Sequence, residues 1–359
     1  MYSRQRVKPM NIAFRVDGGI EIGMGHVMRC ISLAKEFKNA GCAIYFFSRI
    51  QEGINKISDE SFNVIRLAHE TSSNDIGISD FYWETSELIR LIAKYDIELL
   101  IVDTYLVDEM YFQALRPHLK RIAYIDDLNR FVYPVDILIN GNLTGEYEKY
   151  IKYSDNELML LGLKYNLIRD EFRNLPKRII NHEVKEIMIT TGGTDPYHLS
   201  LKIAQWILRD EYFKNIKLNV VIGGGFKNIE QLEELSKHYS NLVLYQNVKY
   251  MSEIMLCSDI AISAGGSTLY ELCACGTPAL ALIMADNQEQ LVQKFDELGY
   301  MQSLGWYHQL KEKPFINQLK SLCNDYNRRC YLANQNQKVV DGYGTQRVAR
   351  EILARAIVD

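Results

Sequence analysis

The sequence has no apolar run long enough to cross a membrane. Its apolar runs have the length of β-strands, whereas a membrane-spanning helix needs roughly 18 or more apolar residues in a row. Residues 1–11 are polar and basic. We therefore expect neither a membrane span nor the apolar core of a signal peptide.

The chain also lacks a strong charge of either sign. Its 41 basic and 45 acidic residues leave a net charge of −4 over 359 residues. A balance so close to neutral provides no field that would attract nucleic acid or an anionic membrane. The composition, 47% hydrophobic and 24% charged, is ordinary for a globular protein, and the length predicts two domains.

Cysteine is scarce and irregularly spaced, with seven residues in all. Cys273 and Cys275 lie two residues apart on a predicted helix and point to different faces, so they do not share one metal ion. This pattern favours reduced thiols and a cytoplasmic location. No metal or other cofactor is predicted, and the oligomeric state stays open, a monomer included.

What the first half does have is an alternation of strand-length apolar runs with helical patterns. The predicted strands are 12–16, 43–47, 99–102, 121–125 and 137–139, and the predicted helices are 27–40, 84–95 and 110–119. Strands that alternate with helices of this length indicate βαβ units and a parallel sheet.

The second half repeats the plan after a charged segment at 161–181, which is interpreted as the linker. Its predicted strands are 186–190, 218–222, 242–245, 260–263 and 279–283, and its predicted helices are 198–208, 229–238, 252–257, 268–275, 288–298 and 346–357. The α/β pattern predicts two doubly wound, Rossmann-like domains with a cleft between them. We expect them at 11–165 and 180–305, followed by a helical extension at 306–359.

A glycine-rich loop after the first predicted strand carries the first candidate for chemistry. It leads into a helix whose expected first residue is His26, and ligands of open α/β sheets bind at such strand ends. We expect His26 to act as a base, because a helix start favours the neutral imidazole and lowers its pKa. Arg15 and Gly25, at the two sides of this loop, are predicted to contact the substrate.

Two further strand ends of the first half carry carboxylates. Asp103 and Tyr105 follow one strand, and Asp126 and Asp127 follow the next. Either Asp17 or Asp103 could orient His26, and the sequence leaves this choice open. Asp126 and Asp127 are explained equally well by turn and cap chemistry, and two adjacent carboxylates without a third do not predict a metal site.

Two glycine loops follow strands of the second half. One contains Gly193 and Thr194, and the other runs through Gly265, Gly266, Ser267 and Thr268. Glycines let the backbone approach a ligand, and N–H groups at a helix start attract phosphate. Two such loops suit a diphosphate. The alternative is that the glycines only make tight turns, and no lysine follows either loop, which argues against a nucleotide-hydrolysing P-loop.

Three more polar residues of the second half are candidates for binding a sugar. Glu271 lies one helical turn after Ser267 and could accept hydrogen bonds from ribose hydroxyls, or form a capping box. Asn287 and Gln288 follow a strand and could bind a sugar or an amide without adding charge. Their alternative role is to cap the next helix.

These motifs occur together in an order that resembles a known family. They are Phe14-Arg15-Val16-Asp17, Gly23-Met24-Gly25-His26-Val27-Met28-Arg29, Val102-Asp103-Thr104-Tyr105, Ile125-Asp126-Asp127-Leu128, Gly192-Gly193-Thr194-Asp195 and Ala264-Gly265-Gly266-Ser267-Thr268-Leu269-Tyr270-Glu271-Leu272. Over roughly residues 11–300 the chain resembles the UDP-2,4-diacetamido-2,4,6-trideoxy-β-L-altropyranose hydrolases of pseudaminic acid biosynthesis and their spore-coat-polysaccharide relatives.

The resemblance implies a GT-B fold related to that of the MurG glycosyltransferases. It also implies an enzyme that removes UDP from an amino sugar by attack of water at C1, with inversion and without a metal. The family's catalytic histidine falls on His26, and its supporting tyrosine falls on Tyr105. Thr104 stands where the family's Asp-His-Tyr motif has histidine.

Three other functions fit the same architecture. A glycosyltransferase of the MurG type would need an acceptor surface, which the sequence does not show. A hydrolysing 2-epimerase would change the configuration at C2 of the sugar. A binding module without catalysis would have no use for His26.

Overall fold

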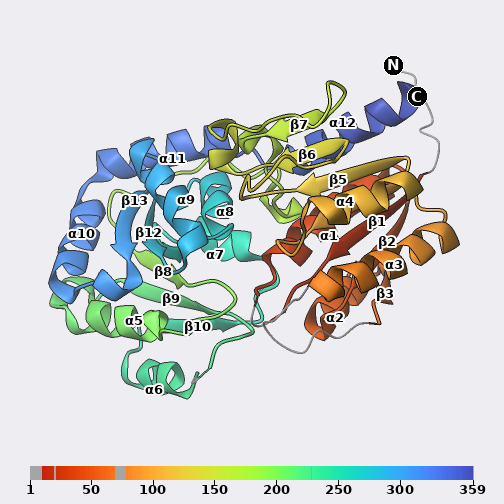
Figure 1. Cartoon of the computed structure of the whole chain (residues 1–359). Helices are drawn as coiled ribbons and strands as arrows, with labels where there is room; N and C mark the ends of the chain where they lie inside the picture. Colours follow the sequence, from red (N-terminus) through yellow and green to blue (C-terminus); the bar gives the residue numbers. More distant parts are fainter. Residues whose placement is uncertain (1–9, 20–21, 69–77, 228, 359) are drawn as a thin grey trace. The chain divides into compact units, whose positions relative to one another are not determined.

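The chain folds into two compact units (Figure 1). The computed structural model describes residues 10–19, 22–68, 78–227 and 229–358. The first unit comprises the chain up to Arg169 and again from Tyr343 onward, and the second comprises Asp170–Gly342. The chain therefore first passes from one unit to the other between Arg169 and Asp170, inside the charged segment that we interpreted as the linker.

The described residues of the first unit contain a seven-stranded sheet in the order β3-β2-β1-β4-β5-β6-β7. Every pair of neighbouring strands is parallel. The strands are β1 Asn11–Val16, β2 Ala43–Ser48, β3 Asn63–Arg66, β4 Leu99–Asp103, β5 Arg121–Ile125, β6 Ile137–Asn140 and β7 Leu158–Leu161.

Helices cover both faces of this sheet, as the doubly wound pattern requires. They are α1 Gly25–Asn39, α2 Gln51–Asp59, α3 Ile78–Lys94, α4 Glu109–Leu115 and, from the end of the chain, α12 Gly344–Val358. Ile12 and Phe14 of β1 pack in one cluster with α1, α2 and α12. Ala13, between them, packs in the opposite cluster with α3 and α4. Because side chains of a strand alternate between the two faces, each strand residue can be assigned to one helix layer.

The second unit repeats the architecture with a six-stranded parallel sheet, in the order β10-β9-β8-β11-β12-β13 for its described residues. The strands are β8 Glu186–Thr190, β9 Lys217–Ile222, β10 Leu242–Gln246, β11 Ile260–Ala264, β12 Ala279–Ile283 and β13 Gln302–Trp306. The helices are α5 Leu199–Arg209, α6 Glu230–His238, α7 Met251–Cys257, α8 Thr268–Cys275, α9 Asp286–Glu297, α10 Glu312–Asn324 and α11 Tyr326–Val339.

The strands that the sequence pattern missed are edge strands. β3 and β7 close the two edges of the first sheet, and β13 closes one edge of the second. Their side chains are partly exposed, whereas β4 and β12 are buried throughout. An edge strand lacks a neighbour on one side and needs less apolar sequence, so its pattern is weaker.

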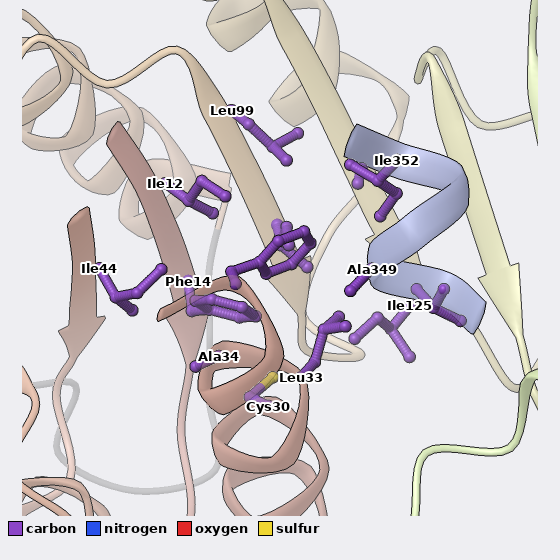
Figure 2. Packing of buried hydrophobic residues seen from close by; sticks show 14 of the residues in the cluster. Ile12, Phe14, Cys30, Leu33, Ala34, Ile44, Leu99, Ile125, Ala349 and Ile352 are labelled. Atoms are coloured by element: carbon purple, nitrogen blue, oxygen red, sulfur yellow. The ribbon is translucent and has the colours of Figure 1, made fainter. Parts of the chain in front are cut away.

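The segment predicted as a helical extension is shared between the units. α10 and α11 belong to the second unit, and α12 belongs to the first. Figure 2 shows Ala349 and Ile352 of α12 pointing into the same cluster as Leu33 of α1 and Ile125 of β5. The end of the chain thus completes the core beneath the first sheet. No helix in the described ranges combines the length and the apolar character needed to cross a membrane.

Replacing Ile352 by alanine should destabilise the first unit. The side chain is fully buried, and deleting most of a buried isoleucine costs about 2–5 kcal/mol because a cavity remains. Urea unfolding followed by hydrogen exchange of peptides from α1 and β1 measures the change. Arg350→Ala on the exposed side of α12 is the control, and equal unfolding midpoints for both variants would contradict the assignment.

Candidate active site

The glycine loop after β1 folds back on itself before α1 begins. The N–H of Gly19 donates to the carbonyl of Gly23 at 3.1 Å. Gly23 has a φ of +80°, which glycine adopts without strain. At Gly18, a Cβ atom would lie 2.6 Å from the side chain of Val27. The loop therefore packs tightly on α1, which begins at Gly25, one residue before the predicted start at His26.

His26 faces a buried carboxylate at the end of β4. Its Nδ1 lies 3.1 Å from Oδ1 of Asp103, which is fully buried. The ring of Tyr105 meets the imidazole edge-on, with ring centres 4.7 Å apart. A proton on Nδ1 satisfies the carboxylate and leaves the lone pair of Nε2 for another partner. The sequence left Asp17 and Asp103 as alternatives, and the contact with His26 is made by Asp103.

Arg29 lies on the same face of α1 as His26 and binds two carboxylates. Its Nε and Nη2 each donate to Asp103 at 2.7 Å, and its Nη1 donates to Asp127 at 3.0 Å. Asp127 also accepts from the hydroxyl of Tyr105 at 2.8 Å. We call these residues, together with Cys30, whose thiol donates to Asp103 at 3.3 Å, the His26 cluster: His26, Arg29, Cys30, Asp103, Tyr105 and Asp127.

The charges of this cluster fix its protonation. Burial alone would raise the pKa of Asp103, but Arg29 and His26 hold it well below its ordinary value. Burial also lowers the pKa of His26, yet the attraction of Asp103 and Asp127 outweighs it and raises that pKa above 6.5. The expectation that the helix start would lower the pKa of His26 is therefore wrong. The reason is that a carboxylate in direct contact acts more strongly than the partial charge of a helix end.

Tyr105 supports the histidine from the side. Burial, followed by the neighbouring Asp127, raises the pKa of Tyr105 far above its ordinary value, so the phenol keeps its proton. That proton is directed at Asp127. Tyr105 therefore holds the imidazole in place through its ring and anchors itself through its hydroxyl.

Arg15 and Asp17 lie in a different network, which corrects two predictions. The guanidinium of Arg15 is 1% exposed, donates to Glu84 at 2.6 and 3.0 Å, and pairs with Asp17 at 2.6 Å. Asp17 further accepts from the hydroxyl of Ser48 at 3.0 Å and from the N–H of Arg49 at 2.7 Å. Arg15 is thus too buried to contact a substrate, and Asp17 does not orient His26.

The alternation of the strands explains this separation. Arg15 continues the side of β1 on which Ala13 packs with α3 and α4. Asp103 continues the side of β4 on which Ile101 packs with α1. Although both residues end neighbouring strands, they project toward opposite helix layers, and only Asp103 meets the helix that carries His26.

The two adjacent aspartates after β5 divide the roles that the sequence left open. Asp126 accepts from the N–H groups of Leu128 and Asn129 and from the hydroxyls of Tyr133 and Tyr150. It therefore shapes the turn. Asp127 points instead into the His26 cluster. Within the described ranges, no group of three or more His, Cys, Asp or Glu side chains could hold a metal ion.

In the second unit, the start of α8 presents backbone N–H groups after β11. The N–H groups of Leu269 and Tyr270 bond back to Gly266 and Ser267 at 3.1 and 3.0 Å. Gly266, Ser267 and Thr268 precede these residues, and backbone N–H groups in such a position have no acceptor within the helix itself. Ser267 is exposed, and its side chain forms no capping bond, so the predicted capping box is not formed through Ser267.

The two glycines of this loop differ in kind. A Cβ atom at Gly265 would lie 2.4 Å from Val292 of α9, and its N–H already donates to the carbonyl of Leu282. Gly265 is therefore required for packing and offers no donor to a phosphate. At Gly266 a Cβ atom would meet nothing within 4 Å. Packing within the chain therefore does not require glycine at position 266.

The other predicted phosphate loop ends at a helix start that is already occupied. Both oxygens of the buried Asp195 accept N–H groups of α5, from Leu199 at 2.9 Å and from Ser200 at 2.8 Å. A carboxylate in that position repels a phosphate. Gly193 and Thr194 lie before this cap, and the carbonyl of Gly193 accepts from the N–H of Gly225 at 2.9 Å.

The hydrogen bond from Gly225 to Gly193 connects a third glycine loop, residues 223–225, to the loop that contains Gly193 and Thr194. A Cβ atom at Gly223 would lie 2.4 Å from the carbonyl oxygen of Gly192. The loop of residues 223–225 is thus packed against residues 192–193. The three glycine loops follow β9, β8 and β11, which are neighbours in the sheet.

The remaining candidate binding residues of the second unit, Glu271, Asn287 and Gln288, differ in how deeply they are buried. Glu271 is buried in the first turn of α8. Asn287 is exposed in the first turn of α9. Gln288 accepts from the N–H of Met284 at 2.9 Å through its Oε1. The N-cap of α9 is Ala285 and forms no side-chain capping bond, so neither Asn287 nor Gln288 is the N-cap that we considered.

Arg29 and Cys30 are the members of the His26 cluster to which we assigned no role from sequence. Their spacing from His26, three and four residues, places all three on one face of a helix. This spacing was readable, but the carboxylate that it serves lies 73 or more residues away along the chain.

A family model described as the glycosyltransferase family 28 C-terminal domain matches residues 187–339. An uncharacterized protein of Methanocaldococcus jannaschii is 29% identical over 86% of this chain, and the match spans 62% of that protein. The UDP-2,4-diacetamido-2,4,6-trideoxy-beta-L-altropyranose hydrolase of Campylobacter jejuni is 28% identical over 81% of this chain and 98% of its own length. The spore coat polysaccharide biosynthesis protein SpsG of Bacillus subtilis is 23% identical, with 94% and 96% covered.

The chain is a homologue of this hydrolase and of SpsG. The family resemblance that the motifs suggested is thereby confirmed. Among solved structures, MurG of Acinetobacter baumannii matches with a TM-score of 0.69 at 13% identity, over 96% of this chain and 99% of MurG. A UDP-GlcNAc 2-epimerase of Neisseria meningitidis, bound to UDP-GlcNAc, matches with a TM-score of 0.64 at 13% identity, over 96% and 100%. These likenesses confirm the predicted GT-B fold.

The raised pKa of His26 can be tested without any substrate. We expect the imidazole to titrate above 6.5 in the wild type and at a lower pH in Asp103→Asn, because the variant loses the nearest negative charge. Proton NMR of the His26 ring as a function of pH measures both values. A titration of Asp103→Asn at or above the wild-type value would contradict the assignment.

Proposed function

We propose that this chain hydrolyses a UDP-linked deoxy amino sugar to UDP and the free sugar. The candidate substrate is UDP-2,4-diacetamido-2,4,6-trideoxy-β-L-altropyranose, which the name of the Campylobacter jejuni relative contains. The observation that carries the proposal is the pairing of His26 with the buried Asp103 at 3.1 Å. An imidazole held by a carboxylate through Nδ1, with Nε2 available, is a general base for water.

The reaction needs one proton acceptor and a stabilised leaving group. His26 takes a proton from water through Nε2 while the water oxygen bonds to C1 of the sugar. The bond between C1 and the diphosphate oxygen breaks, and UDP leaves with the electron pair. Attack from the side opposite the leaving group inverts C1. The imidazolium that forms is stabilised by Asp103 and Asp127, whose two negative charges exceed the single positive charge of Arg29.

Donors of the second unit suit the diphosphate. The N–H groups of Gly266, Ser267 and Thr268 would bind the charge that develops on UDP, and the helix dipole of α8 adds to the attraction. Gly193 and Thr194, which we considered for the same role, are left out of the proposed diphosphate site, because the carboxylate of Asp195 caps the helix start that follows them. Glu271 and Asn287 are the proposed partners of sugar and ribose hydroxyls.

Thr104 stands where the family motif has histidine, and its surroundings define a local role. Its side chain is buried, and its Oγ1 accepts the N–H of Leu106 at 3.2 Å. It shapes the turn after β4, so the proposed mechanism uses no group at this position. The seven cysteines, all of which lie in the described residues, form no disulfide, which suits the cytoplasmic location that we propose for the enzyme.

A glycosyltransferase is the second candidate, because MurG shares the fold. The two reactions differ in the acceptor of the sugar. A hydrolase releases free sugar without any added acceptor, whereas a glycosyltransferase does not turn over until an acceptor is supplied.

Replacing His26 by alanine should lower the rate of UDP release by about 10²–10⁴-fold, the usual contribution of a general base. The exposed His238→Ala is the matched control and should retain wild-type activity. Proton NMR of the protein with the candidate UDP-sugar measures UDP release and the anomer that forms first. For the wild type, kcat/KM should fall as the pH drops below the raised pKa of His26, since only the neutral imidazole accepts a proton.

Undiminished hydrolysis by His26→Ala would show that the base is wrongly assigned. Sugar transfer that depends on an added acceptor would favour the glycosyltransferase. A changed configuration at C2 of the product would favour an epimerase.

Replacing Gly266 by alanine should weaken UDP binding and leave the fold intact. The added methyl group meets no protein atom within 4 Å but would crowd a phosphate at the start of α8. Isothermal titration with UDP measures the effect, for which we expect about a tenfold loss, equivalent to 1.4 kcal/mol. Gly265→Ala is the contrast, because its methyl group collides with Val292 and should lower the thermal midpoint instead. Unchanged UDP affinity in Gly266→Ala would argue against phosphate at this helix start.

A further inference from the structure

Helix α1 places three donors around one carboxylate. His26, Arg29 and Cys30 occupy one helical face, and all three contact Asp103. Arg29 differs from the other two because it also reaches a second carboxylate, Asp127, at 3.0 Å. Its guanidinium thus ties the ends of β4 and β5 to the helix that carries the histidine.

The geometry of the arginine fixes where Asp103 points. Nε and Nη2 of Arg29 donate to the two different oxygens of Asp103, both at 2.7 Å. Such a planar, two-bond pairing locks the plane of the carboxylate. With the carboxylate fixed, Oδ1 remains 3.1 Å from Nδ1 of His26. A lysine would supply the charge but not the planar two-bond grip.

The charge of the arginine limits the negative field at the histidine. Asp103 and Asp127 both favour the imidazolium, and Arg29 opposes it. The other neighbours, Tyr105 and Cys30, keep their protons, because burial raises the pKa of the phenol and of the thiol well above their ordinary values. Arg29 is therefore the positive charge of the cluster that works against protonation of His26.

We propose that Arg29 is a positioning residue for His26: its guanidinium holds Asp103 against the imidazole and, by its charge, keeps the two surrounding carboxylates from fixing a proton on His26. The inference concerns the proton affinity of His26 and rests on the proposed function only where turnover is used as a readout. It assigns to Arg29 two separable effects, one of geometry and one of charge.

Two single variants separate the charge effect from general damage. Arg29→Gln removes the opposing positive charge, so the pKa of His26 should rise by about one unit or more, the size of shift that a neighbouring charge produces. Asp127→Asn removes a favouring negative charge, so the pKa should fall. NMR titration of His26 in the full chain measures both, and the exposed Arg350→Gln on α12 is the control for loss of an arginine in the same unit.

Opposite shifts in the two variants support the proposal, and the double variant Arg29→Gln/Asp127→Asn should return toward the wild-type value. Shifts in the same direction, or none in either variant, would overturn it, because a merely structural disturbance has no reason to reverse sign. This readout needs no substrate, so it stands apart from a failure of the proposed hydrolase activity.

A third variant isolates the geometric effect. Arg29→Lys keeps the charge and loses the planar grip on Asp103, so the pKa of His26 should stay near the wild-type value while kcat for UDP release falls about tenfold or more, with little change in KM. If Arg29→Gln does not fold, this variant and Asp127→Asn carry the test. A wild-type kcat in Arg29→Lys would overturn the positioning role. If no UDP-sugar is hydrolysed by the wild type, the proposed function fails while the titrations still decide the role of Arg29.

Discussion

The pairing of the buried Asp103 carboxylate with donors of α1 is the interaction on which the arrangement of side chains at the strand ends of the first unit depends. The carboxylate is fully buried, and a buried charge is stable only when it is paired and hydrogen-bonded. Arg29, His26 and Cys30 meet that requirement from a single helix. The register of α1 against β4 is therefore tied to the chemistry of the site, since a rotated helix would leave the carboxylate without partners.

The same carboxylate supports the proposed role of His26 as a base. Its contact with Nδ1 at 3.1 Å favours a proton on that nitrogen, which would leave Nε2 to accept one, and its charge favours the imidazolium. Asp127 adds a second negative charge near the imidazole. Tyr105 packs edge-on against the imidazole ring and donates its hydroxyl proton to Asp127. The neighbouring network on the opposite face of the sheet pairs two arginines, Arg15 and Arg49, with the two carboxylates of Asp17 and Glu84. Two ionic networks thus lie at the carboxyl ends of neighbouring strands, and only one of them contacts His26, the proposed base.

Two helix starts of the second unit differ in their side-chain caps. Asp195 caps the start of α5, whereas the N-cap residue of α8, Ser267, forms no side-chain capping bond and is preceded by Gly266, at which a Cβ atom would meet nothing within 4 Å. Identical-looking glycine loops after parallel strands are therefore not equivalent. This difference in capping is the reason why we place the proposed diphosphate at the start of α8.

The sequence by itself determined the alternation of strands and helices, the central strands, and the motif that places His26 at a helix start. These features depend on local periodicity and on glycine, which a single segment contains. The sequence pattern missed the edge strands β3, β7 and β13. An edge strand has a neighbouring strand on one side only, so its side chains are less buried and its apolar pattern is weaker.

Only the tertiary structure decided which carboxylate meets His26, which direction its pKa moves, and which glycines the packing requires. The first two depend on the face toward which a side chain projects and on partners more than 70 residues away along the chain. The third depends on contacts with other elements, such as that between Gly265 and Val292 of α9.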